Sequence, residues 1–121
     1  MRDALKQFIS CHTKCTAYID FIPDVKTQAD ATGIFCYSDD PQGDGSGWQR
    51  YQIQVRRKTY SQAYDESKLL YKLLDSGEDE EPVVLCNCSP CFIRHRNGPK
   101  VFDRGPNYST FYFEISVFYN G

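Results

Sequence analysis

Cysteine and histidine are the side chains of this sequence with the most specific chemistry. The chain has six cysteines and two histidines in 121 residues. Thiolate and imidazole groups are the usual ligands of structural zinc, which takes four of them in tetrahedral geometry. One interpretation is therefore a zinc site whose central ligands come from one short segment, namely Cys86, Cys88 and Cys91. The site would be completed by His95 or by Cys11 and Cys15.

The spacing of these cysteines argues against zinc. Structural sites usually present two C-x2-C pairs, whereas only Cys88 and Cys91 have that spacing. Cys86 and Cys88 fall on one face of an expected strand, and thiols are among the most often buried side chains. We therefore predict reduced cysteines that are mostly packed in the fold, with no metal and no other cofactor. Disulfides are not expected, because residues 1–8 carry charges and lack the apolar segment of a signal peptide.

No arrangement of residues indicates catalysis. No cysteine has a base that the sequence assigns to it, and both histidines are expected at the surface. Triads, carboxylate dyads and phosphate-binding loops are not recognisable, so we predict a protein that is not an enzyme. Residues 38–47, which include Asp39 and Asp44, lack the ligand spacing and closing Glu of a calcium loop. This segment is expected to be a loop that becomes ordered against a neighbouring subunit.

Composition narrows the class of protein. The net charge is −2, with 40% apolar and 25% charged residues, as in a soluble globular protein. We predict a single domain over residues 1–121. Sequence-independent binding to nucleic acid is not expected, because the longest basic cluster is Arg56, Arg57 and Lys58. These cations are expected to be solvated or to contact another protein. No apolar run approaches the roughly 20 residues that cross a bilayer, so a membrane partner is not expected either.

The elements that must position such residues begin with a strand over residues 49–58. Tyr51, Ile53 and Val55 lie on one face, and the polar Gln52 and Gln54 lie on the other. A helix then runs over residues 60–76, beginning at Tyr60 and ending at Ser76. Thr59 and Gln62 form a capping box before it, and Gly77 stops it. Its buried stripe is predicted to be Ala63, Ser67, Leu70 and Leu74.

A second alternating strand is predicted over residues 108–119, with Phe111, Phe113, Ile115 and Val117 on the buried face. Its length places it inside the sheet or projecting beyond it. The remaining predictions are a two-turn helix over residues 3–9, strands at 16–22, 33–38, 83–88 and 91–95, and turns at 97–99 and 103–107. The fold class is α+β: a mixed, mostly antiparallel sheet, with the main helix on one face and a short N-terminal helix.

Residues 51–74 (YQIQVRRKTYSQAYDESKLLYKLL) resemble the tail terminators and related minor capsid proteins of tailed bacteriophages. The family pairs a strand of the kind "vQIqvR" with an "A…a..iy..L" helix. The matching positions here are Gln52, Ile53, Gln54, Val55, Arg56, Ala63, Ser67, Leu70, Tyr71 and Leu74. The corner IPD at residues 22–24 and the closing strand STFYFEISVFY at 109–119, after Arg104 and Gly105, are also similar. The resemblance covers about two-thirds of the chain; the expected N-terminal helix is shorter than the family's.

The resemblance implies a structural virion protein that forms a ring, expected to be a hexamer. Such a ring caps the tail tube, ends tail polymerisation and offers an interface to the head–tail connector. The implied partners are copies of the chain, the tail tube protein and a connector or neck protein, with DNA passing through the lumen. The implied location is the tail or neck of the virion, and the host cytoplasm during assembly.

A closed ring needs contacts between unlike patches of neighbouring subunits. The exposed faces of the two long strands and the loop between residues 38 and 47 are expected to supply them. The expected contact residues are Gln52, Gln54, Arg56, Arg57, Tyr112, Glu114, Phe118, Asp39 and Asp44. Two alternatives stay open: another neck or head-completion protein, and a small zinc-binding regulatory module, perhaps acting on nucleic acid.

Overall fold

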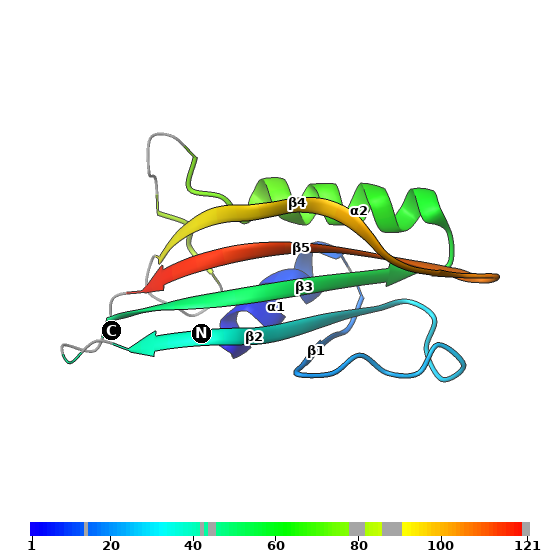
Figure 1. The fold of residues 1–121 in the computed structure, drawn as a ribbon, viewed down its shortest axis with the longest axis horizontal. Helices are drawn as coiled ribbons and strands as arrows, with labels where there is room; N and C mark the ends of the chain where they lie inside the picture. The colour runs from blue at the N-terminus through cyan, green and yellow to red at the C-terminus, as the bar shows by residue number, and fades with distance from the viewer. Residues whose placement is uncertain (14, 42, 44–45, 78–81, 86–90, 120–121) are drawn as a thin grey trace.

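The computed structural model of the chain has two helices and a five-stranded sheet (Figure 1). It describes residues 1–13, 15–41, 43, 46–77, 82–85 and 91–119. The elements are α1 (Arg2–Thr13), β1 (Ala17–Ile19), β2 (Ala31–Pro41), β3 (Gly47–Arg57), α2 (Tyr60–Leu73), β4 (Cys91–Gly105) and β5 (Tyr108–Tyr119). The strand order is β1-β2-β3-β5-β4, with β1 parallel to β2 and every other pair antiparallel. The predicted α+β class is confirmed, and β5 lies inside the sheet as its length indicated.

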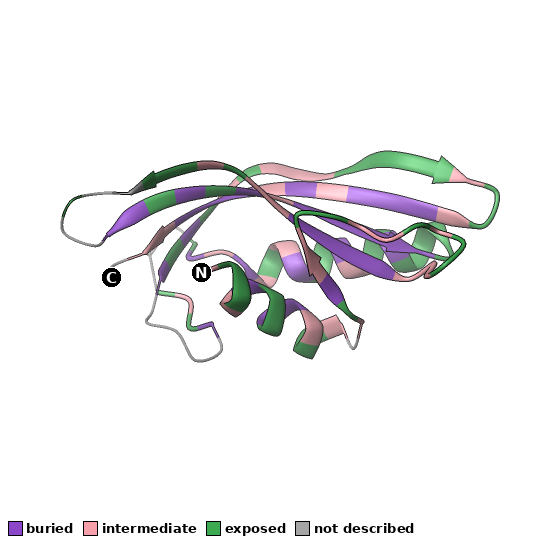
Figure 2. Ribbon diagram, turned by 90° about the horizontal axis from the view of Figure 1, so that it is seen from below, coloured by how far each residue is buried: buried purple, intermediate pink, exposed green. Residues whose placement is uncertain are grey.

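Both helices lie on the same side of the sheet (Figure 2). Apolar residues of both helices pack against one face of the long strands and form a single core with it. Along each strand these buried residues alternate with polar residues that point to the other face. The fully buried core side chains include Leu5, Ile9, Ile34, Tyr51, Ile53, Val55, Leu70, Leu74, Phe113, Ile115 and Val117. No helix within the described residues covers the opposite face of the sheet.

The helix α2 begins as predicted. The Thr59 hydroxyl accepts a hydrogen bond of 3.2 Å from the backbone N–H of Gln62, which satisfies one of the donors left open at a helix start. The predicted stripe is buried at all four positions. The helix ends at Leu73 instead of Ser76, because the backbone of Leu74 leaves helical geometry at φ −92° and ψ 60°.

The N-terminal helix is longer than predicted, and the strand after it is shorter. The helix α1 has 12 residues. Its last turn is supported by the Thr13 hydroxyl, which donates to the Ile9 carbonyl at 2.7 Å, and by the ring of His12 against Phe8. The strand β1 stops after Ile19 because Asp20 takes a left-handed conformation, φ 66°, which interrupts the extended chain.

Two predicted breaks in the sheet are wrong. Residues 38–41 belong to β2, and Pro41 is paired with Gly47 across the hairpin. Residues 42, 44 and 45 of the expected loop lie outside the described part of the chain. The sequence 97–99 is not a turn, since β4 runs through it with register shifts on both sides. In both places the segment pairs with a neighbouring strand, although its polar or turn-forming residues do not predict a strand. Where one strand has more residues than its partner, a bulge accommodates them.

The remaining strand boundaries also differ. The turn predicted at 103–107 is narrower, because Gly105 still pairs with Tyr108 and only two residues connect β4 to β5. A Cβ at Gly105 would lie 2.0 Å from the Tyr108 ring, so this close approach requires glycine. Of the predicted strand at 83–88, Val83 forms an isolated bridge to Cys91, and residues 84–85 are not extended strand. Residues 86–88 lie outside the described part of the chain.

Candidate functional site: the open face of the sheet

The uncovered side of β2, β3, β5 and β4, here called the open face, brings together most of the predicted contact residues. Residues paired across an antiparallel ladder share a face. Gln54 is paired with Tyr112, Gln52 with Glu114, and Trp48 with Phe118. The two sets that were expected on separate strand faces therefore form one continuous surface, arranged in bands that cross the strands.

The first band is aromatic and lies at the N-terminal end of β3. Phe118 of β5 is paired with Trp48 on one side and with Phe92 of β4 on the other. The rings of Trp48 and Phe118 have centroids 5.0 Å apart. Trp48 is 40% exposed and Phe92 is 38% exposed. Large aromatic side chains that remain this exposed are typical of surfaces that another protein covers.

The second band carries arginines. Arg50 and Arg94 are each paired with Ser116 of β5, and Arg96 donates to the Ser116 hydroxyl at 3.4 Å. These three arginines, with Trp48 and Asp40, line a hollow of about 520 Å³, here called the arginine hollow. Guanidinium groups bind carboxylates through two parallel hydrogen bonds, so this hollow is suited to an acidic group of a partner.

The third band is formed by amides and a carboxylate. The Gln54 side chain donates to Gln52 at 2.8 Å, and Asn97 donates to the Glu114 carboxylate at 2.5 Å. Burial, and after it the negative charge of Glu114, raise the pKa of Tyr37 beside this band. The polar groups of the third band thus bind one another.

Arg56 lies on the same side of β3 but is covered. It is only 6% exposed, and its guanidinium donates to the carbonyls of Pro23, Gln28 and Ala29 at 2.5, 2.6 and 3.1 Å. Burial lowers its pKa. Residues 20–30 connect β1 to β2 and fold over this end of the open face. Arg56 therefore holds a segment of its own chain, so it is not a solvated charge.

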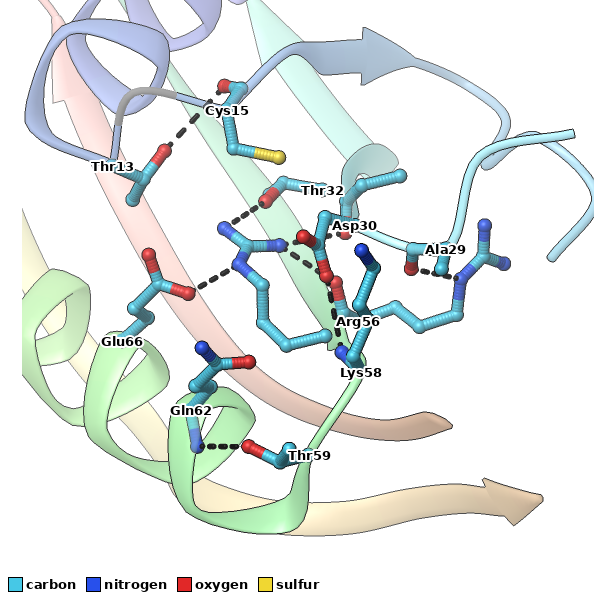
Figure 3. A network of polar contacts seen from close by, with 12 residues as sticks. Thr13, Cys15, Ala29, Asp30, Thr32, Arg56, Lys58, Thr59, Gln62 and Glu66 are labelled. Carbon is cyan, nitrogen blue, oxygen red and sulfur yellow. Dashed lines mark hydrogen bonds and ion pairs between the residues drawn. The ribbon is translucent and has the colours of Figure 1, made fainter. Parts of the chain in front are cut away.

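Arg57 points to the other side of the sheet, because it is the next residue of the strand. It is 3% exposed and forms an ion pair with Glu66 of α2. Its guanidinium also donates to the carbonyls of Ala31 and Arg56 and to the Thr32 hydroxyl, at 3.0, 2.7 and 3.2 Å. Figure 3 shows Glu66 and Thr32 converging on this point from α2 and β2. Arg57 joins the helix to the sheet, and it is not solvated either.

Of the two aspartates expected in a contact loop, only Asp39 lies in the described part of the chain. Asp39 is exposed and lies in β2, paired with Gln49 near the tip of the hairpin. Asp44 lies outside the described residues.

The cysteine and histidine cluster is only partly described. Cys86 and Cys88 lie outside the described residues. Cys91 is buried, with its thiol 3.5 Å from the Val83 carbonyl. His95 was expected at the surface and is only half-buried, because its Nε2 is 2.5 Å from the Tyr71 carbonyl and its ring stacks on the Tyr71 ring. Among the described residues, no three of the types His, Cys, Asp and Glu are grouped to hold a metal ion.

The other cysteines fit the packing prediction only in part. Cys15 and Cys36 are half-buried and Cys11 is exposed, because it lies on the outer side of α1. No helix within the described residues is long and apolar enough to cross a membrane.

Sequence reasoning missed the arginine and aromatic bands. The signal was present, because Trp48 and Arg50 continue the alternation of the predicted strand toward its N-terminus. Arg94 and Arg96 alternate in the same way with the apolar Ile93. Neither alternation shows that the two strands lie on either side of β5, which is what gathers the three arginines.

The comparisons with known proteins agree with this architecture. One solved structure, whose title states no function, has a TM-score of 0.57 at 14% identity, over 97% of this chain and 91% of that chain. A chain of the virion of a native gene transfer agent particle has a TM-score of 0.54 at 10% identity, over 93% of this chain and 84% of that chain. At these identities the likeness shows the fold alone. No curated protein sequence matches the chain.

The family comparison is more specific. The model of the bacteriophage tail terminator protein family matches residues 4–105, which include both helices, β1 to β4 and the whole resemblance at residues 51–74. The chain therefore belongs to the bacteriophage tail terminator family and is a structural protein of the phage tail.

Proposed function

We propose that this protein forms a ring, a hexamer, that caps the phage tail tube, ends tail polymerisation and provides the interface to the head–tail connector. Family membership supports the role at the end of the tail. The observation that carries the contact surface is the open face, where Trp48, Phe92 and Arg50 stay exposed side by side. Aromatic residues and arginine are enriched at protein–protein interfaces.

The proposed partners are copies of this chain, the tail tube protein and a connector or neck protein. DNA passes through the lumen of the ring without sequence-specific binding. The protein is placed at the tail end or neck of the virion, and in the host cytoplasm while tails assemble. The role requires shape and adhesion and no catalysis.

The proposed contacts on the open face involve Gln52, Gln54, Tyr112, Glu114 and Phe118, together with the aromatic and arginine bands. The hairpin that carries Asp39 and Asp44 reaches the tube or an adjacent subunit. Arg56 and Arg57 act on these contacts through the fold, because their guanidinium groups bind carbonyls and a carboxylate of the same chain.

The test combines assembly with tail length. Light scattering of the purified protein, alone and with isolated tail tubes, should reveal a closed oligomer. Tubes grown without the protein should be overlong in electron micrographs, and adding the wild-type chain should restore a uniform length. The double variant Trp48→Ala, Phe92→Ala should lose this effect. Tyr60→Ala is the matched control, because Tyr60 is 43% exposed but lies at the start of α2, on the helix-covered side of the sheet.

A protein that stays monomeric with and without tail tubes would contradict the proposal. If instead the protein bound only to completed heads, the alternative of a head-completion factor would replace it.

A further inference from the structure

An exposed ridge of α2, at the other end of the molecule from the arginine hollow, carries a carboxylate beside an apolar side chain. It is formed by Gln62, Asp65 and Leu69, which are spaced by three and four residues and therefore line up along the helix. This α2 ridge borders a second hollow of about 640 Å³, which is also lined by the carboxylates of Asp30 and Glu66 and by the cations of Arg57 and Lys58. The concave positive site and the convex, partly acidic ridge belong to different parts of the surface.

The two sites face different directions. Arg50 and Arg57 are seven residues apart in β3, or about 23 Å at the usual rise of a strand. The hollow lies on the open face near Arg50, whereas α2 begins just after Arg57 and covers the opposite face (Figures 1 and 2). A head-to-tail contact that closes a ring requires such unlike patches on different sides of one subunit.

The chemistry of the two sites is complementary. Arg50, Arg94 and Arg96 outnumber the single carboxylate of Asp40 in the hollow. Asp65 is exposed on the ridge, and Leu69, 43% exposed, follows it by one helical turn. The carboxylate of Asp65 can bind the arginines of the hollow while Leu69 contacts the aromatic band beside it. This is the pattern by which an amphipathic helix enters a groove.

The order of signs is also matched. Lys72 lies on the same side of α2 as Asp65, about 10 Å further along the helix. Asp40 lines the hollow beside the arginines. A ridge laid in the hollow with Asp65 at Arg50 and Lys72 toward Asp40 therefore joins opposite charges at both points, whereas the reverse orientation opposes like charges.

We infer that the α2 ridge of one subunit docks in the arginine hollow of the next, with Asp65 bound by Arg50 and its neighbouring arginines. This inference rests on the proposed ring and names the contact that closes it. A second copy is favoured over nucleic acid as the occupant. Asp40 within the hollow would repel a continuous phosphate backbone, whereas the α2 ridge can place the cation of Lys72 on that side.

Charge reversal tests the contact. Arg50→Glu and Asp65→Arg are each expected to weaken self-association at least tenfold, because like charges then meet in every contact of the ring. An equimolar mixture of the two variants should assemble again, since each contact in an alternating ring joins opposite charges. The double variant should assemble by itself for the same reason. Assembly of the wild type should weaken as salt is raised from 0.05 to 0.5 M, roughly, because screening shortens the reach of the charges.

The matched control is Lys6→Glu, which makes the same change of charge on the exposed side of α1 and should leave assembly unchanged. Equal free energies of unfolding for all variants would show that folding is intact. The inference is overturned if either single reversal assembles like the wild type, or if the mixture fails to recover. It is also overturned if Arg50→Glu loses binding to DNA while self-association is unchanged. A wild type that does not assemble, alone or on tail tubes, would instead refute the ring itself.

Discussion

The two faces of the sheet use the same residue types for different purposes. On the helix-covered face, Arg57 is buried by four partners from its own chain, and aromatic residues such as Phe113 are fully enclosed. On the open face, Arg50 and Trp48 keep their charged and aromatic groups exposed. An arginine is structural where carbonyls or carboxylates of its own chain surround it, and available to a partner where they do not. The following predictions test that distinction, beginning with the largest effect.

Two phenylalanines of β5 give the sharpest contrast between the faces. Phe113→Ala should lower the free energy of unfolding by about 3–5 kcal/mol, because it leaves a cavity in the core. Phe118→Ala, on the open face of the same strand, should lower it by less than about 1 kcal/mol. Urea denaturation followed by fluorescence measures both. Equal losses would mean that the open face is as much a part of the core as the helix-covered face.

Arg57 should be the most important charge for stability. Arg57→Ala removes the partner of Glu66 and leaves buried carbonyls unpaired, so the free energy of unfolding should fall by about 3 kcal/mol. Arg50→Ala is the control in the same strand and should change it by no more than about 0.5 kcal/mol. The assignment of Arg57 to the fold fails if its variant is as stable as that control.

Arg56 should have a smaller and more local effect. Arg56→Ala removes three hydrogen bonds to the connection at residues 20–30, which is partly open to water, so we expect a loss of about 2 kcal/mol. Amide hydrogen exchange should accelerate in that connection more than in β5. The loss of stability in Arg56→Lys should lie between those of the wild type and Arg56→Ala, since an ammonium group cannot reproduce the planar set of donors of the guanidinium. Uniform acceleration over the whole chain would contradict a local role.

The buried Tyr51 predicts a loss of stability at high pH. Burial raises its pKa above the ordinary value of about 10. At a pH below that value the Tyr51 hydroxyl is protonated in both the folded and the unfolded chain, so its contribution to the free energy of unfolding is fully present. Above it the unfolded chain releases the proton first, so stability falls by up to about 1.4 kcal/mol per pH unit. Urea denaturation at a series of pH values should show that Tyr51→Phe reduces this slope between pH 9 and 11, roughly.

Much of the fold could be predicted because several independent signals agree in β3, α2 and β5. Alternation over residues 49–58, the cap at Thr59 and the stripe ending at Leu74 each have a local physical cause. The family resemblance was carried by the same segment, residues 51–74, that the family comparison includes. These elements are also the ones that place Gln52 and Glu114 side by side.

The errors arise where a neighbouring strand decides the conformation. Residues 38–41 are polar and 97–99 form a turn-like sequence, yet both pair with a long strand that supplies backbone partners. The arginine hollow was missed for a related reason. Arg50 and Arg94 are far apart in sequence and meet only because each is paired with Ser116 of β5. Single-strand patterns do not contain that pairing.

The outer edge of β2 has a consequence for how copies can join. The strand β1 pairs only with residues 32–34, so the rest of β2 has no strand beside it in the part of the chain that the structure describes. That edge carries a bulge after Cys36, two aspartates and Pro41, all of which discourage backbone pairing. In the proposed ring, copies that meet at this edge therefore associate through side chains and do not extend the sheet from β2. A subunit that, as proposed, ends the growth of a tube is kept at this edge from starting a polymer of its own.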